Sequence, residues 1–194
     1  LQIRGAGNLL GQSQLGHMAA VGYELYMKML GQALAEAKGE APAPDKSDCL
    51  IDITVDAYIP ENYIPEASGQ IEAYKRIAAV STPEDAADVL DELIDRYGDV
   101  PPSVSGLIDV SLARVTAARV GVYEVGQKGE NLILYSDRLN PQKLRPLLTD
   151  LTGRITLNAS AKPYLSVRVK TGEKPLDILR MTLEKMDEAD TSAS

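Results

Sequence analysis

Hydrophobic and polar residues alternate one by one between residues 50 and 59, which is the most regular pattern in the chain. The apolar members are Ile51, Ile53, Val55, Ala57 and Ile59, and the residues between them are Asp52, Thr54, Asp56 and Tyr58. Alternation with a period of two is typical of a strand with one buried and one solvated face. The pattern therefore predicts a strand over residues 50–59.

Three helices are predicted after this strand, because apolar residues then recur every three or four positions. The first covers about residues 69–80 and has Ile71, Tyr74 and Ile77 on its inner line. The third starts near Pro102 and continues through an apolar line that includes Leu107, Ile108, Leu112 and Val115.

The second of these helices has the clearest boundaries. Thr82 is a favourable N-cap, Pro83 suits the first helical position, and Gly98 stands just past the end. Its predicted inner face consists of Val89, Leu90, Leu93, Ile94 and Tyr97. Its predicted outer face carries Asp88, Asp91, Glu92 and Asp95. We interpret this outer face as a solvated acidic surface and a candidate interaction face, with a metal site as the alternative.

Strands and short helices follow residue 121. Strands at 122–125 and 132–136 flank a predicted turn at 127–130, and a second strand pair is predicted at 154–158 and 164–170. A helix is predicted from Asn140 to about Leu151. Pro146 lies far inside it, which predicts a kink or a late start. A last helix begins near Pro175, and residues 191–194 are expected to be disordered.

The resulting order, β-ααα-ββ-α-ββ-α, does not alternate as a doubly wound fold would. It predicts an α+β fold in which a mostly antiparallel sheet has helices on one side. A Gly-rich loop and one long helix, over about residues 16–38, precede it. The Pro-rich residues 41–48 are a predicted linker, so the expected units are residues 1–40, 41–48 and 49–194.

The composition of the chain excludes several kinds of function and binding site. The net charge of −8 argues against the chain holding DNA by itself, because duplex binding depends on lysines and arginines. The single cysteine, Cys49, cannot form an internal disulfide and is expected to be a buried thiol in a reducing, cytoplasmic setting. Together with the lone His17 it cannot build a metal site, so no metal is expected. No apolar run is long enough for a membrane span.

The loop at residues 4–16 contains four glycines, and its simplest interpretation is a flexible turn. Two nucleotide-binding interpretations fail on spacing. Gly5, Gly7 and Gly11 give G-x-G-x-x-x-G instead of the dinucleotide fingerprint. The nearest lysine, Lys28, lies too far away for a P-loop. The chain also lacks an initial methionine, which suggests a cut within a longer protein.

Residues 3–16, Ile-Arg-Gly-Ala-Gly-Asn-Leu-Leu-Gly followed by Gln-x-Gly, resemble the translocation motif of bacterial DNA translocases such as RecG and the transcription-repair coupling factor, Mfd. Residues 55–65 and 92–98 resemble the C-terminal domain of the coupling factor, which RecG lacks. The resemblance runs to about residue 121. It implies that Arg4 and Gln14, set among Gly5, Gly7 and Gly11, help couple ATP hydrolysis to movement along DNA.

The resemblance further implies a parent that uses ATP and magnesium, moves on duplex DNA, displaces stalled RNA polymerase and recruits UvrA for nucleotide excision repair. The C-terminal domain is implied to be non-catalytic and autoinhibitory, because it covers the UvrB-like module of the same parent chain. The alternative is a motor-coupling segment of a RecG-like helicase, which residues 1–40 fit and residues 49–194 do not. A small-molecule enzyme is disfavoured, because no nucleophile–base pair accompanies the one histidine.

Overall fold

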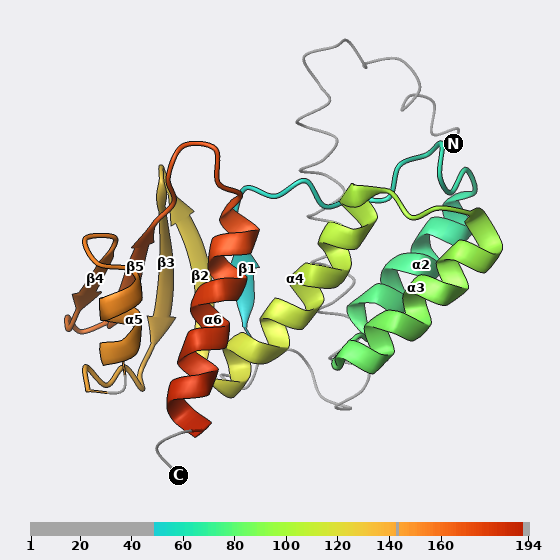
Figure 1. The fold of residues 1–194 in the computed structure, drawn as a ribbon. Coiled ribbons are helices and arrows are strands. Elements are labelled where there is room, and N and C mark those ends of the chain that lie inside the picture. Colours follow the sequence, from blue (N-terminus) through green and yellow to red (C-terminus); the bar gives the residue numbers. More distant parts are fainter. Residues whose placement is uncertain (1–48, 143, 192–194) are drawn as a thin grey trace, which may run out of the picture.

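A five-stranded sheet in the order β1-β2-β3-β5-β4 forms the centre of the fold (Figure 1). The computed structural model describes residues 49–142 and 144–191. In chain order the elements are β1 (Leu50–Asp52), α2 (Ala67–Ala78), α3 (Pro83–Tyr97), α4 (Pro102–Arg119), β2 (Val122–Lys128), β3 (Asn131–Ser136), α5 (Arg145–Asp150), β4 (Ile155–Asn158), β5 (Tyr164–Arg168) and α6 (Pro175–Thr191). β1 and β2 run parallel, and every other neighbouring pair is antiparallel. The predicted α+β class and order of elements are confirmed.

One face of the sheet is packed against helices. Leu132 and Leu134 of β3 and Leu165 and Val167 of β5 are fully buried on that face. Helix α6 contacts α4 and α5, and α4 also contacts β2 (Figure 1). Burying a leucine side chain contributes about 1.5–3 kcal/mol, so this layer supplies much of the driving force for folding.

Helices α2 and α3 form an antiparallel hairpin beside α4 (Figure 1). The core-facing residues of α2 are Ala73, Tyr74, Ile77 and Ala78, and those of α3 are Ala86, Val89 and Leu93. Ile71 and Ile94, both expected to be buried, are instead 42% and 46% exposed. Each lies at the margin of its apolar line, where the neighbouring helices no longer cover the surface.

The predicted strand at 50–59 is wrong beyond residue 52. The burial still alternates from Ile51 to Ile59, but residues 53–60 form an extended connection without a partner strand among the described residues. Its backbone N–H groups bond elsewhere: Thr54 donates to Gln127 Oε1 at 2.8 Å, and Ile59 donates to the Tyr74 hydroxyl at 3.0 Å. The period-two pattern therefore correctly indicates which side of residues 53–60 is buried. The element packed against this segment is helix α4, and not a neighbouring strand.

Most other boundaries lie within two residues of expectation, but β2 continues to Lys128, into the predicted turn, and α6 includes Thr191, which was expected to be disordered. Helix α5 starts late, with Pro146 in its first turn, where a missing N–H is tolerated. The β2–β3 hairpin turns at Gly129, which has a φ of +60°. In the part of the chain that the structure describes, no helix is both long enough and apolar enough to cross a membrane. The predicted loop, long helix and linker at residues 1–48, and the tail from residue 192, lie outside the described residues.

Candidate interaction surface

The start of α3 is held by a capping box. The Thr82 hydroxyl accepts a hydrogen bond from the Asp85 N–H at 3.1 Å, and the Asp85 carboxylate accepts one from the Thr82 N–H at 3.0 Å. Ser81 adds its hydroxyl at 2.8 Å and its N–H at 3.0 Å to the same carboxylate oxygen. These donors, the Ser81 hydroxyl foremost, lower the pKa of Asp85 below its ordinary value. The cap fixes where α3 begins and how it leaves the preceding turn.

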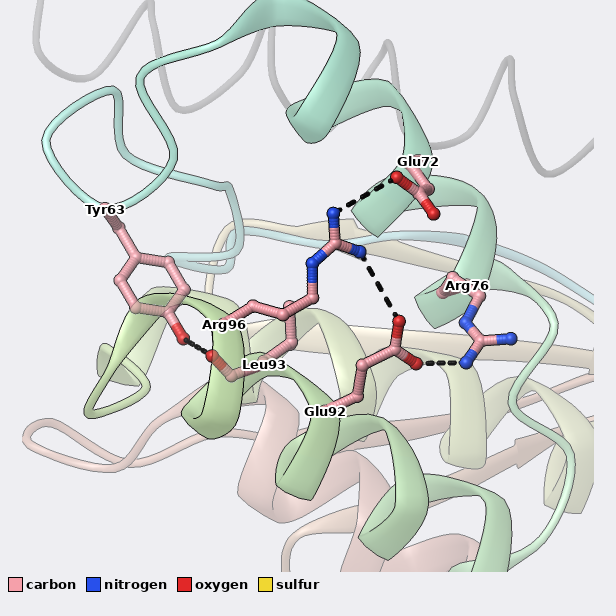
Figure 2. A network of polar contacts seen from close by, with 6 residues as sticks. All are labelled: Tyr63, Glu72, Arg76, Glu92, Leu93 and Arg96. Carbon is pink, nitrogen blue, oxygen red and sulfur yellow. Dashed lines mark hydrogen bonds and ion pairs between the residues drawn. The ribbon is translucent and has the colours of Figure 1, made fainter.

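The other end of α3 is held by Tyr63. Its hydroxyl lies 3.2 Å from the Leu93 carbonyl oxygen (Figure 2). The same hydroxyl lies 3.1 Å from the Gly98 carbonyl oxygen. Its ring meets Tyr97 edge-on, with centroids 5.9 Å apart. Gly98 has a φ of +83°, a left-handed conformation that favours glycine. Both ends of α3 are therefore fixed by contacts outside the helix itself.

Four charged side chains join α2 to α3. Glu92 pairs with Arg76 of α2, and Arg96 lies 3.5 Å from Glu92 and 3.4 Å from Glu72 (Figure 2). The hydrogen bond from the Arg76 guanidinium is the main reason that the pKa of Glu92 is lowered. Such exposed pairs contribute little stability individually. Their consequence here is geometric, because they direct Glu92 toward α2 and away from the outermost face of α3.

That outermost face is occupied by four carboxylates, Glu84, Asp88, Asp91 and Asp95, which we term the acidic stripe. All four are exposed, and their spacing of four, three and four residues places them on one line of the helix. No residue that the structure describes forms a hydrogen bond or ion pair with their side chains. Ala87 and Ile94 flank Asp91 at the same helical spacing and are also exposed. The surface thus combines unpaired negative charge with an accessible apolar side chain.

The structure brings together Asp88, Asp91 and Asp95 of the predicted interaction face. Glu92, which was also predicted on this face, instead belongs to the ion-pair network with α2. The fourth member of the acidic stripe is Glu84. Sequence reasoning missed Glu84, although continuing the i, i+4, i+7 spacing backwards from Asp95 finds it. No comparable pattern in the sequence indicated that Ile94 would be exposed. Arg4, Gly5, Gly7, Gly11 and Gln14 of the predicted translocation motif lie outside the described residues.

The chemistry available to the acidic stripe is recognition of cations. Among the described residues, no group of three or more His, Cys, Asp or Glu side chains is placed to hold a metal ion. Exposed carboxylates accept hydrogen bonds from arginine and lysine, and they repel the phosphates of a nucleic acid. The stripe is therefore complementary in charge to protein surfaces that carry basic side chains.

The chain is similar to known proteins of one family, as a family model and individual relatives both indicate. The model of the TRCF domain matches residues 53–146. A transcription-repair-coupling factor of Bacillus subtilis is 36% identical over 182 residues, which are 91% of this chain and 15% of that protein. A transcription-repair-coupling factor of Staphylococcus epidermidis is 42% identical over 133 residues, which are 68% of this chain and 11% of that protein. The chain thus spans only a small part of the length of these relatives.

A solved structure shares the fold. The crystal structure of the C-terminal domain of a transcription-repair coupling factor superposes with a TM-score of 0.66. The match covers 76% of this chain and 96% of that chain, at 23% sequence identity. At this identity the likeness is evidence for the fold and its topology.

Proposed function

The chain belongs to the TRCF domain family, and from this premise we propose that residues 49–194 are the C-terminal regulatory domain of a transcription-repair coupling factor. The domain itself is non-catalytic and acts by contact with another part of its parent. The observation that carries the proposal is the acidic stripe of α3, which presents four carboxylates without a described partner next to the exposed Ile94.

The contact that we propose is with the UvrB-like module of the same parent chain. In the resting state the domain covers this module and so keeps UvrA from binding it. A tethered domain needs only a weak contact to stay closed, because a short linker such as residues 41–48 holds the local concentration near the millimolar range, on the order of 1 mM. Interfaces between domains of one chain are accordingly modest and polar, as the acidic stripe is.

The parent's activity forms the second part of the proposal. The parent is an ATP-dependent translocase that moves on duplex DNA in the cytoplasm, displaces stalled RNA polymerase and recruits UvrA. ATP and magnesium bind to its motor, outside this chain. Within this chain, Arg4 and Gln14 transmit the motor's movement, while the regulatory domain follows on its linker. The net charge of −8 supports placing the DNA grip elsewhere in the parent.

Binding in trans tests the contact. The chain is mixed with the isolated UvrB-like module of its parent, and the dissociation constant is measured by calorimetry at low and high salt. The triple variant Asp88→Lys, Asp91→Lys, Asp95→Lys is expected to weaken binding at least about tenfold, since charge complementarity is reversed.

A matched control changes the net charge equally at other exposed positions. Asp52→Lys, Asp56→Lys, Glu184→Lys leaves the acidic stripe intact and is expected to retain nearly the affinity of the unmodified chain. Equal losses in both triple variants would show that overall charge, and not the acidic stripe, governs binding. Absence of binding by the unmodified chain would contradict the proposed contact.

A further inference from the structure

Strand β4 leaves one edge of the sheet open. The Arg168 N–H donates to the Arg154 carbonyl oxygen at 2.9 Å, which marks a hydrogen-bonding position of the antiparallel ladder, while the Arg154 N–H donates to the Leu151 carbonyl oxygen. The register then makes Thr156–Ser166 and Asn158–Tyr164 hydrogen-bonded pairs as well. The N–H and C=O groups of Ile155 and Leu157 consequently point away from β5. No residue that the structure describes pairs with them there.

β4 is only four residues long, which limits pairing at this edge, but the strand carries none of the charged, proline or bulge blocks that natural edge strands also use. Natural edge strands are commonly blocked by lysine, proline or a bulge. Residues 155–161, Ile-Thr-Leu-Asn-Ala-Ser-Ala, contain no charge and no proline, and the β4–β5 register is continuous. The chain as a whole has a net charge of −8, so two copies repel each other over most of their surface. Residues 155–161 carry no charge, and a second copy can approach there without direct repulsion.

Helix α5, which packs on α6, carries an exposed leucine. Leu144, Leu147 and Leu151 form the buried line of α5. Asp150 lies on one side of this line and pairs with Lys185 of α6, whereas Leu148 lies on the opposite side and is 38% exposed. Figure 1 places α5 on the β4 side of α6. Leu148 therefore lies on the side of α5 that turns away from Lys185 of α6.

We propose that β4 pairs antiparallel with β4 of a second copy of this chain and joins the two sheets into one. The outward groups of Ile155 bond those of Leu157 in the other copy, and the reverse pair forms by symmetry. Thr156 then faces Thr156 of the second copy across the twofold axis, as a non-hydrogen-bonded pair. The helix layers of both copies lie on the same side of the joined sheet, so the two α5 helices lie on the same face of the dimer.

A second copy suits this edge because an isologous interface must be self-complementary. The uncharged strand, the single central threonine and the partly exposed Ile155 and Leu157 fulfil that requirement. Four residues bury less surface than a permanent interface needs, so association is weak and depends on concentration. This dimer is independent of the acidic stripe, which lies on α3 at the far side of α4 (Figure 1).

Sedimentation equilibrium of the full chain from micromolar to millimolar concentration tests the proposal. Reversible dimerisation is expected. Thr156→Lys places two like charges opposite each other and should weaken it about fivefold. A mixture of Thr156→Lys with Thr156→Glu should associate more tightly than either variant alone. Thr54→Lys changes another exposed threonine, next to β1 at the other edge of the sheet; it is the control and should leave association unchanged.

The register is tested by cross-linking. Directly opposed residues of a non-hydrogen-bonded pair lie close enough for a disulfide, so Thr156→Cys should give a covalent dimer on mild oxidation. Thr54→Cys should not, and it also controls for the buried Cys49. A chain that stays monomeric up to millimolar concentration would overturn the proposal. Equal cross-linking yields at positions 156 and 54 would also overturn it. The same holds if β4 pairs with an extended peptide of another protein and never with a second copy of this chain.

Discussion

Gly106 of α4 lies directly against the backbone of Asp56: a Cβ atom at position 106 would stand 2.8 Å from the Asp56 carbonyl oxygen. The extended connection 53–60 crosses α4 at this point, next to the hydrogen bond from the Tyr58 N–H to the Ser103 carbonyl oxygen at 3.3 Å. A glycine inside a helix normally lowers its stability, so its presence here follows from this close approach.

Gly106→Ala is expected to destabilise the domain by about 1–3 kcal/mol, because backbone must move to admit the methyl group. Chemical denaturation gives the free energy of unfolding. Gly126→Ala is the control, since no atom lies within 4 Å of a Cβ built there, and its effect should stay within about 0.5 kcal/mol. A stabilised Gly106→Ala protein would contradict the observed contact.

Tyr74→Phe should cost about 1–3 kcal/mol, because it leaves the buried Ile59 N–H without its acceptor. Tyr63→Phe removes a hydroxyl at a partly exposed position and should cost less. Equilibrium unfolding of both variants makes the comparison. Equal losses would mean that the hydroxyl of Tyr74 has no special role in holding the extended connection.

The carboxylate of Asp85 should contribute to stability only while it is ionised. Its pKa is lowered in the folded protein, so the contribution is complete above the ordinary value of 3.8 and is lost as pH falls through the lower folded value. The difference in free energy of unfolding between the unmodified chain and Asp85→Asn should therefore shrink in acid. A difference that stays constant as the pH falls well below 3.8 would contradict a contribution from the ionised carboxylate.

In the full-length parent, Arg4→Ala and Gln14→Ala should impair translocation more than ATP hydrolysis, because the proposed role of the loop is to transmit motion. The two rates are measured on the same DNA, by displacement of a stalled polymerase and by phosphate release. A parallel loss of both activities would assign the loop to phosphoryl transfer. Unaltered displacement would remove it from the coupling mechanism.

Deleting residues 49–194 from the parent should release the resting state. UvrA should bind more readily, and basal ATP hydrolysis should rise in the absence of polymerase, because a ligand that prefers the open state no longer competes with the domain contact. Pull-down with UvrA and steady-state ATPase assays provide the readouts. If neither changes, the domain does not act as a clamp and serves as a scaffold.

Local signals predicted much of the fold. The bounds of α3 follow from Thr82, Pro83 and Gly98, and the late start of α5 follows from Pro146. These residues act through their own backbone conformation and their nearest neighbours, so no distant contact is needed to interpret them. For the same reason three of the four acidic residues predicted on the outer face of α3 were placed correctly.

Contacts between distant segments decided the remainder. Residues 53–60 have the alternation of a strand, yet Gly106 brings α4 against them in place of a partner strand. Glu92 has the spacing of the outer face, yet Arg76, sixteen residues away, draws it toward α2. Ile94 belongs to an apolar line that its neighbours do not fully cover. Periodicity states which side of an element is apolar, whereas the partner that covers each side depends on how the whole chain packs.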